Sequence, residues 1–333
     1  MARKWAAAVV GLLVVALVAV VVVVQTRDEP TPQVRRPSPA SPSPSPTPSP
    51  SGSTQQAVPA RPGPVLAVKI DNASPARPHT GLDAADVIYV ERVEAGITRF
   101  MAVYSSKLPE VIGPVRSARE TDLELLRQFD DPVLAYSGSQ GKLKPFIRAA
   151  PLRPVSAETN PQLYFRGSTR PIPHNLYLRT DRVLEKAPDL ATPQNLGFER
   201  GAAPAGGTPE ASRTVKFPAA RYDFEWSASK KRWLVSMDGS PGMLADGKRL
   251  APAAVIVQEV EIRKGAFGDR WGNNSPFTKT VGTGKATVLR DGKAFDTRWT
   301  RKAPEDLTAF TTPSGEAMTF PKGQIWIVYV PKG

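Results

Sequence analysis

Two arginines stand three positions apart in the segment IGPVRSARE, residues 112–120, where a helix is predicted to begin. Ser117 and Glu120 match the S-x-x-E capping box, and the following ETDLELLRQF has apolar residues at helical spacing with an acidic first turn. A helix N-terminus exposes backbone donors and carries partial positive charge, which favours anions. Because Arg116 and Arg119 add positive charge there, we expect them to bind a phosphate or a carboxylate.

A third arginine, Arg99, begins a predicted strand and could complete a clamp with Arg116 and Arg119. The alternative is that the three arginines form an ion network inside the protein. The carboxylates available for such a network are Asp86, Glu91, Glu94 and Glu120. The sequence leaves both interpretations open.

Glu94 and His174 are the acid/base pair that the sequence offers, since a carboxylate can orient an imidazole that titrates near neutrality. These two residues are the candidates for catalysis. A simpler interpretation of the segment PHNLY is that His174 and Asn175 fix a loop through hydrogen bonds to the backbone.

Residue types limit the other chemistry. The chain has no cysteine and only two histidines, which excludes disulfides, thiol nucleophiles and zinc sites made of thiolates or three histidines. Oxygen ligands for a hard cation could come from Asp71, Asn72, Asp83 and Asp86, but their spacing is not that of an EF-hand loop. Asp and Asn are also common in turns. We therefore predict no metal site and no cofactor.

The elements that must position these residues differ between the two halves. Runs rich in Val, Ile and aromatic residues at 65–71, 85–93 and 98–106 predict strands, and they are followed by segments with helical patterns. This alternation predicts an α/β layer domain at 65–190. Residues 215–333 instead contain short β-branched runs separated by DG, SG and KG turns, which predict a mostly antiparallel β domain, a sandwich or a partly open barrel. The predicted fold class is α+β.

The N-terminal residues predict a membrane anchor. Residues 5–24 carry no charge and are nearly all Ala, Val and Leu, which at about 1.5 Å per residue is long enough to cross the roughly 30 Å core of a bilayer. Arg3 and Lys4 precede this stretch, so the positive-inside rule predicts a single-pass protein with a cytoplasmic N-terminus and exported C-terminal domains. A cleaved signal peptide is the alternative.

Composition divides the rest of the chain. The Pro/Ser-rich segment after the anchor cannot bury enough apolar surface to fold, and it predicts an extended stalk. A Gly-, Pro- and Ala-rich stretch between the two halves predicts a linker. The predicted organisation is an anchor with its cytoplasmic tip at 1–27, a disordered stalk at 28–64, the α/β domain at 65–190, a linker at 191–214 and the β-rich domain at 215–333.

The net charge of +13 is spread along the chain. A diffuse positive excess favours anionic surroundings, such as wall polymers or lipid head groups. We do not expect nucleic acid as a partner, because the chain is predicted to be exported and has no recognition helix or aromatic-basic motif.

Several long motifs resemble a known family. The run KIDNASPARPHTGLDAADVIYVERVEAGITRFMAVY, then IGPVRSARE and PHNLY, resembles the N-terminal domain of the YerB-like family of candidate bacterial lipoproteins. The segments YDFEWS, AVIVQEVEI, GTGKATVLRDGKAFDTRWTR and FTTPSGEAMTFPKGQIWIVYVP resemble the C-terminal domain of that family. The resemblance implies a two-domain architecture and no agreed biochemical activity. Lipid-anchored members begin with a lipobox cysteine, which this chain replaces with the predicted transmembrane segment.

The motif positions that the resemblance carries over are mostly polar, which favours a surface site over a packing motif. Those that we predict to bind a ligand are Asn72, Arg77, Arg99, Arg116, Ser117, Arg119 and Asn175. The leading hypothesis is a membrane-anchored extracytoplasmic protein that binds an anionic or glycan-type ligand of the cell envelope, such as a wall polymer or peptide. The alternatives are a wall-active hydrolase or transferase that uses Glu94 and His174, and a scaffold for membrane-bound envelope proteins. Whether a reaction is catalysed and which oligomer forms are left open.

Overall fold

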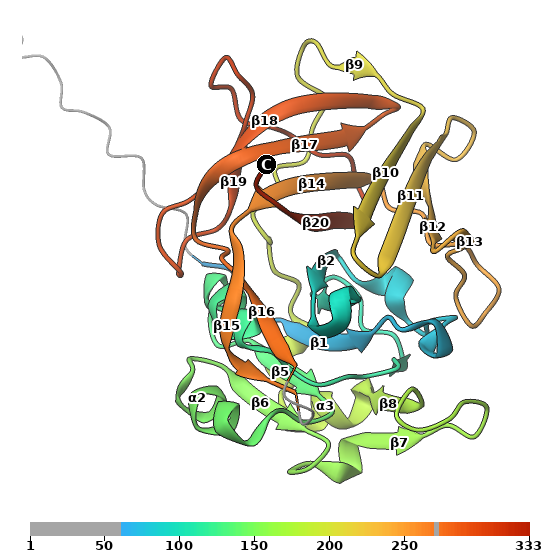
Figure 1. Ribbon diagram of the computed structural model, residues 1–333, viewed down its shortest axis with the longest axis vertical. Helices are drawn as coiled ribbons and strands as arrows, with labels where there is room; N and C mark the ends of the chain where they lie inside the picture. The colour runs from blue at the N-terminus through green and yellow to red at the C-terminus, as the bar shows by residue number, and fades with distance from the viewer. Residues whose placement is uncertain (1–60, 270–272) are drawn as a thin grey trace, which may run out of the picture. The chain divides into compact units, whose positions relative to one another are not determined.

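Strands dominate residues 61–269 and 273–333, which are the residues that the computed structural model describes (Figure 1). The three α-helices in this part of the chain are only six or seven residues long: α1 (Glu120–Leu125), α2 (Lys144–Ala149) and α3 (Thr180–Lys186). The remaining helical turns are short 3-10 segments at Ser74–Ala76, Leu82–Ala84, Glu94–Gly96, Leu126–Gln128, Gly141–Leu143, Pro161–Leu163 and Pro188–Ala191. The predicted α+β class with an α/β layer domain at 65–190 is therefore wrong, because helices this short cannot form a covering layer.

An 11-stranded sheet runs through both halves of the sequence. Its order is β19-β18-β17-β14-β20-β2-β3-β1-β5-β6, with β9 paired to β18. In chain order the strands are β1 (Leu66–Asp71), β2 (Val87–Arg92), β3 (Thr98–Tyr104), β5 (Val133–Tyr136), β6 (Arg153–Ser156), β9 (Thr208–Pro209), β14 (Ala254–Val260), β17 (Gly282–Arg290), β18 (Lys293–Arg301), β19 (Ala309–Thr311) and β20 (Ile325–Pro331).

The strand β20 joins the two halves. It pairs in parallel with β2 on one side and with β14 on the other, so that Ile325 lies opposite both Val87 and Ala254. Its first five residues, IWIVY, are all buried, as expected for a strand that is covered on both faces. The domain boundaries predicted from composition stay a prediction, but strands from both segments form one sheet.

Three smaller sheets complete the fold (Figure 1). They contain β10 (Ser212–Phe217), β11 (Ala220–Ser227), β12 (Arg232–Met237) and β13 (Ser240–Pro241); β4 (Val111–Ile112), β8 (Leu176–Arg179) and β7 (Tyr164–Arg166); and the hairpin of β15 (Ile262–Gly268) and β16 (Asn274–Thr278). Figure 1 shows this hairpin extending from the C-terminal strands toward α2, where Phe267 packs against Phe146 with ring centroids 5.4 Å apart. The hairpin thus connects the two halves a second time.

Alternation along β1 separates two cores. Leu66, Val68 and Ile70 point into one apolar cluster, which also contains Trp326. Ala67 points to the opposite face and into a second cluster. Lys69 and Asp71 share the face of Ala67, so two charged side chains of a buried strand need partners there.

The helix α1 supplies a partner for Lys69 through Asp122, and it begins later than the sequence predicts. Arg119 is its N-cap, and Asp122 Oδ2 accepts the backbone N–H of Arg119 at 2.6 Å. The predicted capping box of Ser117 and Glu120 is therefore wrong, because the box is shifted by two residues. The Glu120 carboxylate accepts the backbone N–H of Ala266 in the β15–β16 hairpin instead, at 2.7 Å.

Among the described residues, no helix is long and apolar enough to cross a bilayer. The predicted span at 5–24 and the predicted stalk up to residue 60 lie outside the described residues.

Candidate functional site

The site is built where β1, β3 and β2 lie side by side. Asp71 at the end of β1 pairs with Arg99 of β3, and Arg99 pairs with Glu91 of β2. The neighbouring strand β5 pairs only with residues 66–68 of β1. Beyond residue 68, residues 114–116 take the place of β5 beside β1. The Pro114 carbonyl accepts the Asp71 N–H, and the Arg116 N–H donates to the Lys69 carbonyl. The arginine-bearing loop is therefore fixed to the strand by backbone hydrogen bonds.

Arg119 and Glu94 form a bidentate ion pair. The distances are 2.6 Å from Nε to Oε1 and 2.9 Å from Nη2 to Oε2. The Ser275 hydroxyl also donates to Oε1 of Glu94. Burial opposes ionisation of Glu94, but the hydrogen bond and attraction from Arg119 outweigh it and lower the pKa of this carboxyl. Gly96 makes the turn at Glu94 possible, because its φ is +73° and a Cβ there would lie 2.6 Å from Cβ of Pro218.

Arg99 stands next to this pair. Its Nη1 and the Nη1 of Arg119 donate to the same acceptor, the Ser117 carbonyl, at 3.1 and 3.3 Å. Burial lowers the pKa of Arg99 to about 9; the charges of Arg119 and Arg116 add to this effect, and those of Glu94 and Asp71 oppose it. The three predicted arginines therefore interact within one cluster.

Asp71 organises the more exposed side of the cluster. Its Oδ2 lies 2.8 Å from Nδ1 of His174 and 3.2 Å from Nε of Arg116. The Asp71 side chain is 2% exposed, whereas those of His174 and Arg116 are 18% and 24% exposed. Because Nδ1 of His174 faces Asp71, its Nε2 lies on the opposite edge of the ring.

A second histidine supports Asp71 from inside the core. Nε2 of His79 lies 2.9 Å from the Asp71 carbonyl. Burial lowers the pKa of His79 to about 4, so its ring is neutral near pH 7 and Nε2 donates this hydrogen bond.

The other predicted ligand-binding residues make contacts within the protein. Asn72 donates to the Tyr222 hydroxyl at 2.6 Å, and Arg77 donates to Asp238 at 2.8 Å. Both contacts join the N-terminal loops to the C-terminal half, at β11 and at the turn that follows β12. Asn175 donates a hydrogen bond to the Gly167 carbonyl and accepts one from Arg166, and each has a donor–acceptor distance of 2.8 Å. Their role in ligand binding stays a prediction.

The acid/base pair differs from the predicted one. Glu94 is bound by Arg119 and Ser275, and the carboxylate that contacts His174 is that of Asp71. Spacing in the sequence could not show this, because Asp71 and His174 are brought together only by the fold.

A fully buried triad of titratable side chains was not among the residues predicted from the sequence. Lys69 Nζ lies 2.6 Å from Glu91 Oε2 and 2.6 Å from Asp122 Oδ1, and each of the three side chains is at most 1% exposed. Burial raises the pKa of Glu91 to about 8, against the attraction of Lys69. The available signal was a lysine in the otherwise apolar run VLAVK, since a charge in a buried strand requires partners.

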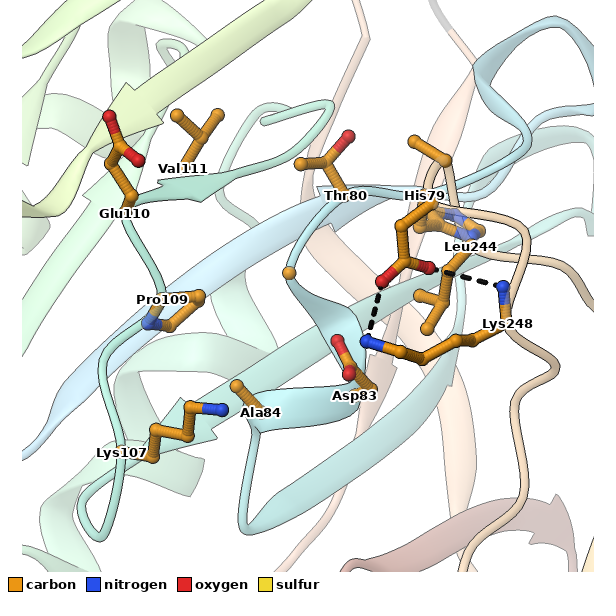
Figure 2. Close-up of a pocket in the computed structure, with 13 residues that line it drawn as sticks. His79, Thr80, Asp83, Ala84, Lys107, Pro109, Glu110, Val111, Leu244 and Lys248 are labelled. Carbon is orange, nitrogen blue, oxygen red and sulfur yellow. Dashed lines mark hydrogen bonds and ion pairs between the residues drawn. The ribbon is translucent and has the colours of Figure 1, made fainter.

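Two cavities lie elsewhere. One, of about 330 Å³, is drawn in Figure 2, and its lining includes His79, Asp83, Lys107, Glu110, Leu244 and Lys248. Lys248 forms a 2.7 Å ion pair with Asp246 there. The other, of about 470 Å³, lies beside Arg77, Met237 and Met243. Arg99, Arg116 and Arg119 line neither cavity, so the arginine cluster is a site separate from both.

Comparison with known proteins gives the class of this chain. Residues 50–193 match the family model described as the N-terminal domain of DUF3048, a protein of unknown function, and residues 213–327 match the model of its C-terminal domain. The chain belongs to this family, and the resemblance to YerB-like proteins is confirmed.

The chain is similar to YerB of Bacillus subtilis in sequence and in structure. The candidate lipoprotein YerB of Bacillus subtilis (strain 168) is 34% identical over 122 residues, which cover 37% of this chain and 37% of that relative. The match thus spans little more than a third of the curated relative. The crystal structure of the YerB protein from Bacillus subtilis aligns with a TM-score of 0.68 at 23% identity, over 84% of this chain and 94% of that chain. This likeness shows a shared fold.

Proposed function

We propose that this chain is a membrane-anchored extracytoplasmic protein that binds an anionic group of a cell-envelope ligand at the cluster of Arg99, Arg116 and Arg119. The ligand class is a phosphate- or carboxylate-bearing wall polymer or peptide. Membrane anchoring outside the cytoplasm is supported by the apolar stretch at 5–24 and by the similarity to a candidate lipoprotein.

The observation that carries this proposal is the charge balance of the cluster. Three guanidinium groups, those of Arg99, Arg116 and Arg119, share the carboxylates of Asp71 and Glu94, which concentrates positive charge in this cluster. Excess charge in a largely buried setting is costly. A bound anion would offset this charge and accept charge-assisted hydrogen bonds.

Exposure supports Arg116 and His174 as the residues that meet the proposed ligand. Arg116 and His174 are the most accessible members, whereas Arg119 is 12% exposed and is held by Glu94. The ligand therefore contacts the Arg116 and His174 edge, and Arg99 and Arg119 contribute positive potential from behind.

The Asp71–His174 contact favours a second candidate function. A carboxylate that holds Nδ1 of an imidazole orients Nε2 for proton transfer. The hydrolase or transferase alternative is therefore proposed with Asp71 and His174, in place of Glu94 and His174. This function predicts turnover of purified wall material that His174→Gln abolishes.

Binding of inorganic phosphate and of purified teichoic acid to the full chain in detergent tests the leading proposal. We expect Arg116→Gln to weaken binding of both at least tenfold. The matched control is Arg153→Gln, which removes the same charge from an arginine paired with Asp131 and Asp189 away from the cluster. Equal affinity of the two variants would contradict the proposal.

A further inference from the structure

The buried triad of Lys69, Glu91 and Asp122 has the composition of a reactive site. The three residues come from β1, β2 and α1 and meet beneath the helix. On this sheet face Ala67, Tyr89, Met101 and Leu125 belong to the core cluster, and Asp71 and Arg99 of the arginine cluster lie toward the strand ends. An amine thus touches a carboxyl group in surroundings closed to solvent.

Backbone contacts fix the orientation of Asp122. Its Oδ2 accepts the Arg119 N–H at 2.6 Å, whereas its Oδ1 faces Lys69 Nζ at 2.6 Å. The donor on Oδ2 would stabilise negative charge that develops there during attack on the carboxyl carbon. Oδ1 is then the oxygen in position to leave.

We propose that Lys69 and Asp122 join in an intramolecular isopeptide bond, with Glu91 transferring the protons. The bond between Nζ of Lys69 and Cγ of Asp122 forms, and the bond between Cγ and Oδ1 breaks. The ammonium group loses two protons and the carboxylate loses one oxygen, and together these leave as one water molecule. Protonated Glu91 gives its proton to Oδ1 and then accepts one from Nζ, and a second such exchange delivers the second proton. Glu91 therefore ends in its starting state, and no oxidant or other reactant is required.

Geometry and environment favour this reaction. Two groups held in contact react as if at very high concentration, and exclusion of water removes the competing hydration of both charges. Glu91 contacts Lys69 and is close to Asp122, and its pKa of about 8, raised by burial, keeps it protonated near pH 7. The product replaces a buried ion pair with a neutral amide, which removes the cost of burying two charges.

The bond would cross-link residues that lie 53 positions apart, joining the central strand β1 to the helix that carries Arg119. A covalent cross-link restricts the unfolded chain, as a disulfide does. The sequence contains no cysteine, so the isopeptide bond would supply a covalent restraint that this chain has no disulfide to provide.

Mass spectrometry of a tryptic digest of the full chain, purified in detergent and held at neutral pH, tests the proposal. We expect one linked pair of peptides that contains Lys69 and Asp122, with the summed mass of the two reduced by one water molecule. The matched control within the same digest is Lys144 and Glu158, which also lie 2.6 Å apart but are 41% and 49% exposed. That pair is expected to remain unlinked.

Variants locate the chemistry. Asp122→Ala is expected to abolish the linked peptide, and Glu91→Gln to reduce its yield at least tenfold, with circular dichroism confirming that Glu91→Gln is folded. The wild-type digest decides the proposal even if a variant fails to fold. Recovery of separate, unmodified Lys69 and Asp122 peptides from folded wild-type protein would overturn it, as would a water loss confined to one peptide.

Discussion

Asp71 Oδ2 lies 2.8 Å from Nδ1 of His174, a residue 103 positions later in the chain. The same oxygen lies 3.2 Å from Nε of Arg116. The buried Asp71 carboxylate therefore positions both Arg116 and His174, the two most exposed members of the cluster. Substitution of Asp71 should alter the charge of the cluster and the orientation of these two side chains.

Asp71→Asn is expected to tighten phosphate binding at low ionic strength, because it removes one of the two carboxylates that offset the three arginines. Salt should reduce the gain, since the added attraction is electrostatic. Titration calorimetry at two salt concentrations measures both effects. Unchanged affinity at low salt would show that the charge balance of the cluster does not govern binding.

Glu94→Gln is expected to lower the free energy of unfolding by about 3–5 kcal/mol, because it leaves the largely buried Arg119 without its ion pair. Denaturant unfolding measures the change. The control Glu158→Gln breaks an exposed pair with Lys144 and should cost about 0–1 kcal/mol. Similar losses for the two variants would argue against a special role for the Arg119–Glu94 pair.

Glu94 should also contribute to acid sensitivity. Its pKa is lowered in the folded protein from an ordinary value of 4.5, so its stabilising contribution is present above pH 4.5 and is lost as the pH falls below that value. The stability difference between wild type and Glu94→Gln should therefore shrink in acid. A difference that stays constant down to pH 3 would contradict this assignment.

Protonation of His79 should destabilise the folded protein at a higher pH than protonation of Glu94 does. Its pKa falls from 6.5 to about 4 on folding, so the unfolded chain binds more protons between these values and stability decreases as the pH falls from 6.5 to 4. The full effect is about 3 kcal/mol, from 1.36 kcal/mol per pKa unit. His79→Gln should flatten the dependence of unfolding free energy on pH across this window, whereas a slope equal to that of wild type would exclude His79 as its source.

Tyr222→Phe is expected to cost about 1–3 kcal/mol, because it leaves the buried Asn72 amide without the 2.6 Å acceptor that β11 provides. Because β20 still pairs with strands of both halves in this variant, tryptophan fluorescence and circular dichroism should still report one shared unfolding transition. Separation into two transitions in the variant alone would show that Tyr222 couples the halves.

The strands near the site could be predicted from sequence, because VLAVKID, VIYVER and TRFMAVY are long buried runs that match β1, β2 and β3. The way these strands and helices assemble could not be predicted from the sequence. α1 ends at Leu125 and continues as a 3-10 turn, and β2 pairs with β20 from the far end of the chain. Neither helix length nor distant strand pairing follows from local periodicity.

The arginine cluster was predictable in part. Arg116 and Arg119 flank a helix start, and Glu94 was among the possible partners, which the structure assigns to Arg119. The contact between Asp71 and His174 depends on loops that only the fold brings together. Lys69 gave a local signal, a charge within a buried run, but its partners come from β2 and α1.

The central claim is that the excess positive charge of the cluster binds an anion, and phosphate titration of Arg116→Gln beside Arg153→Gln tests it most directly. The account predicts that phosphate binding weakens at least tenfold in Arg116→Gln and is unchanged in Arg153→Gln. Equal phosphate affinity in both variants and the wild type would contradict it.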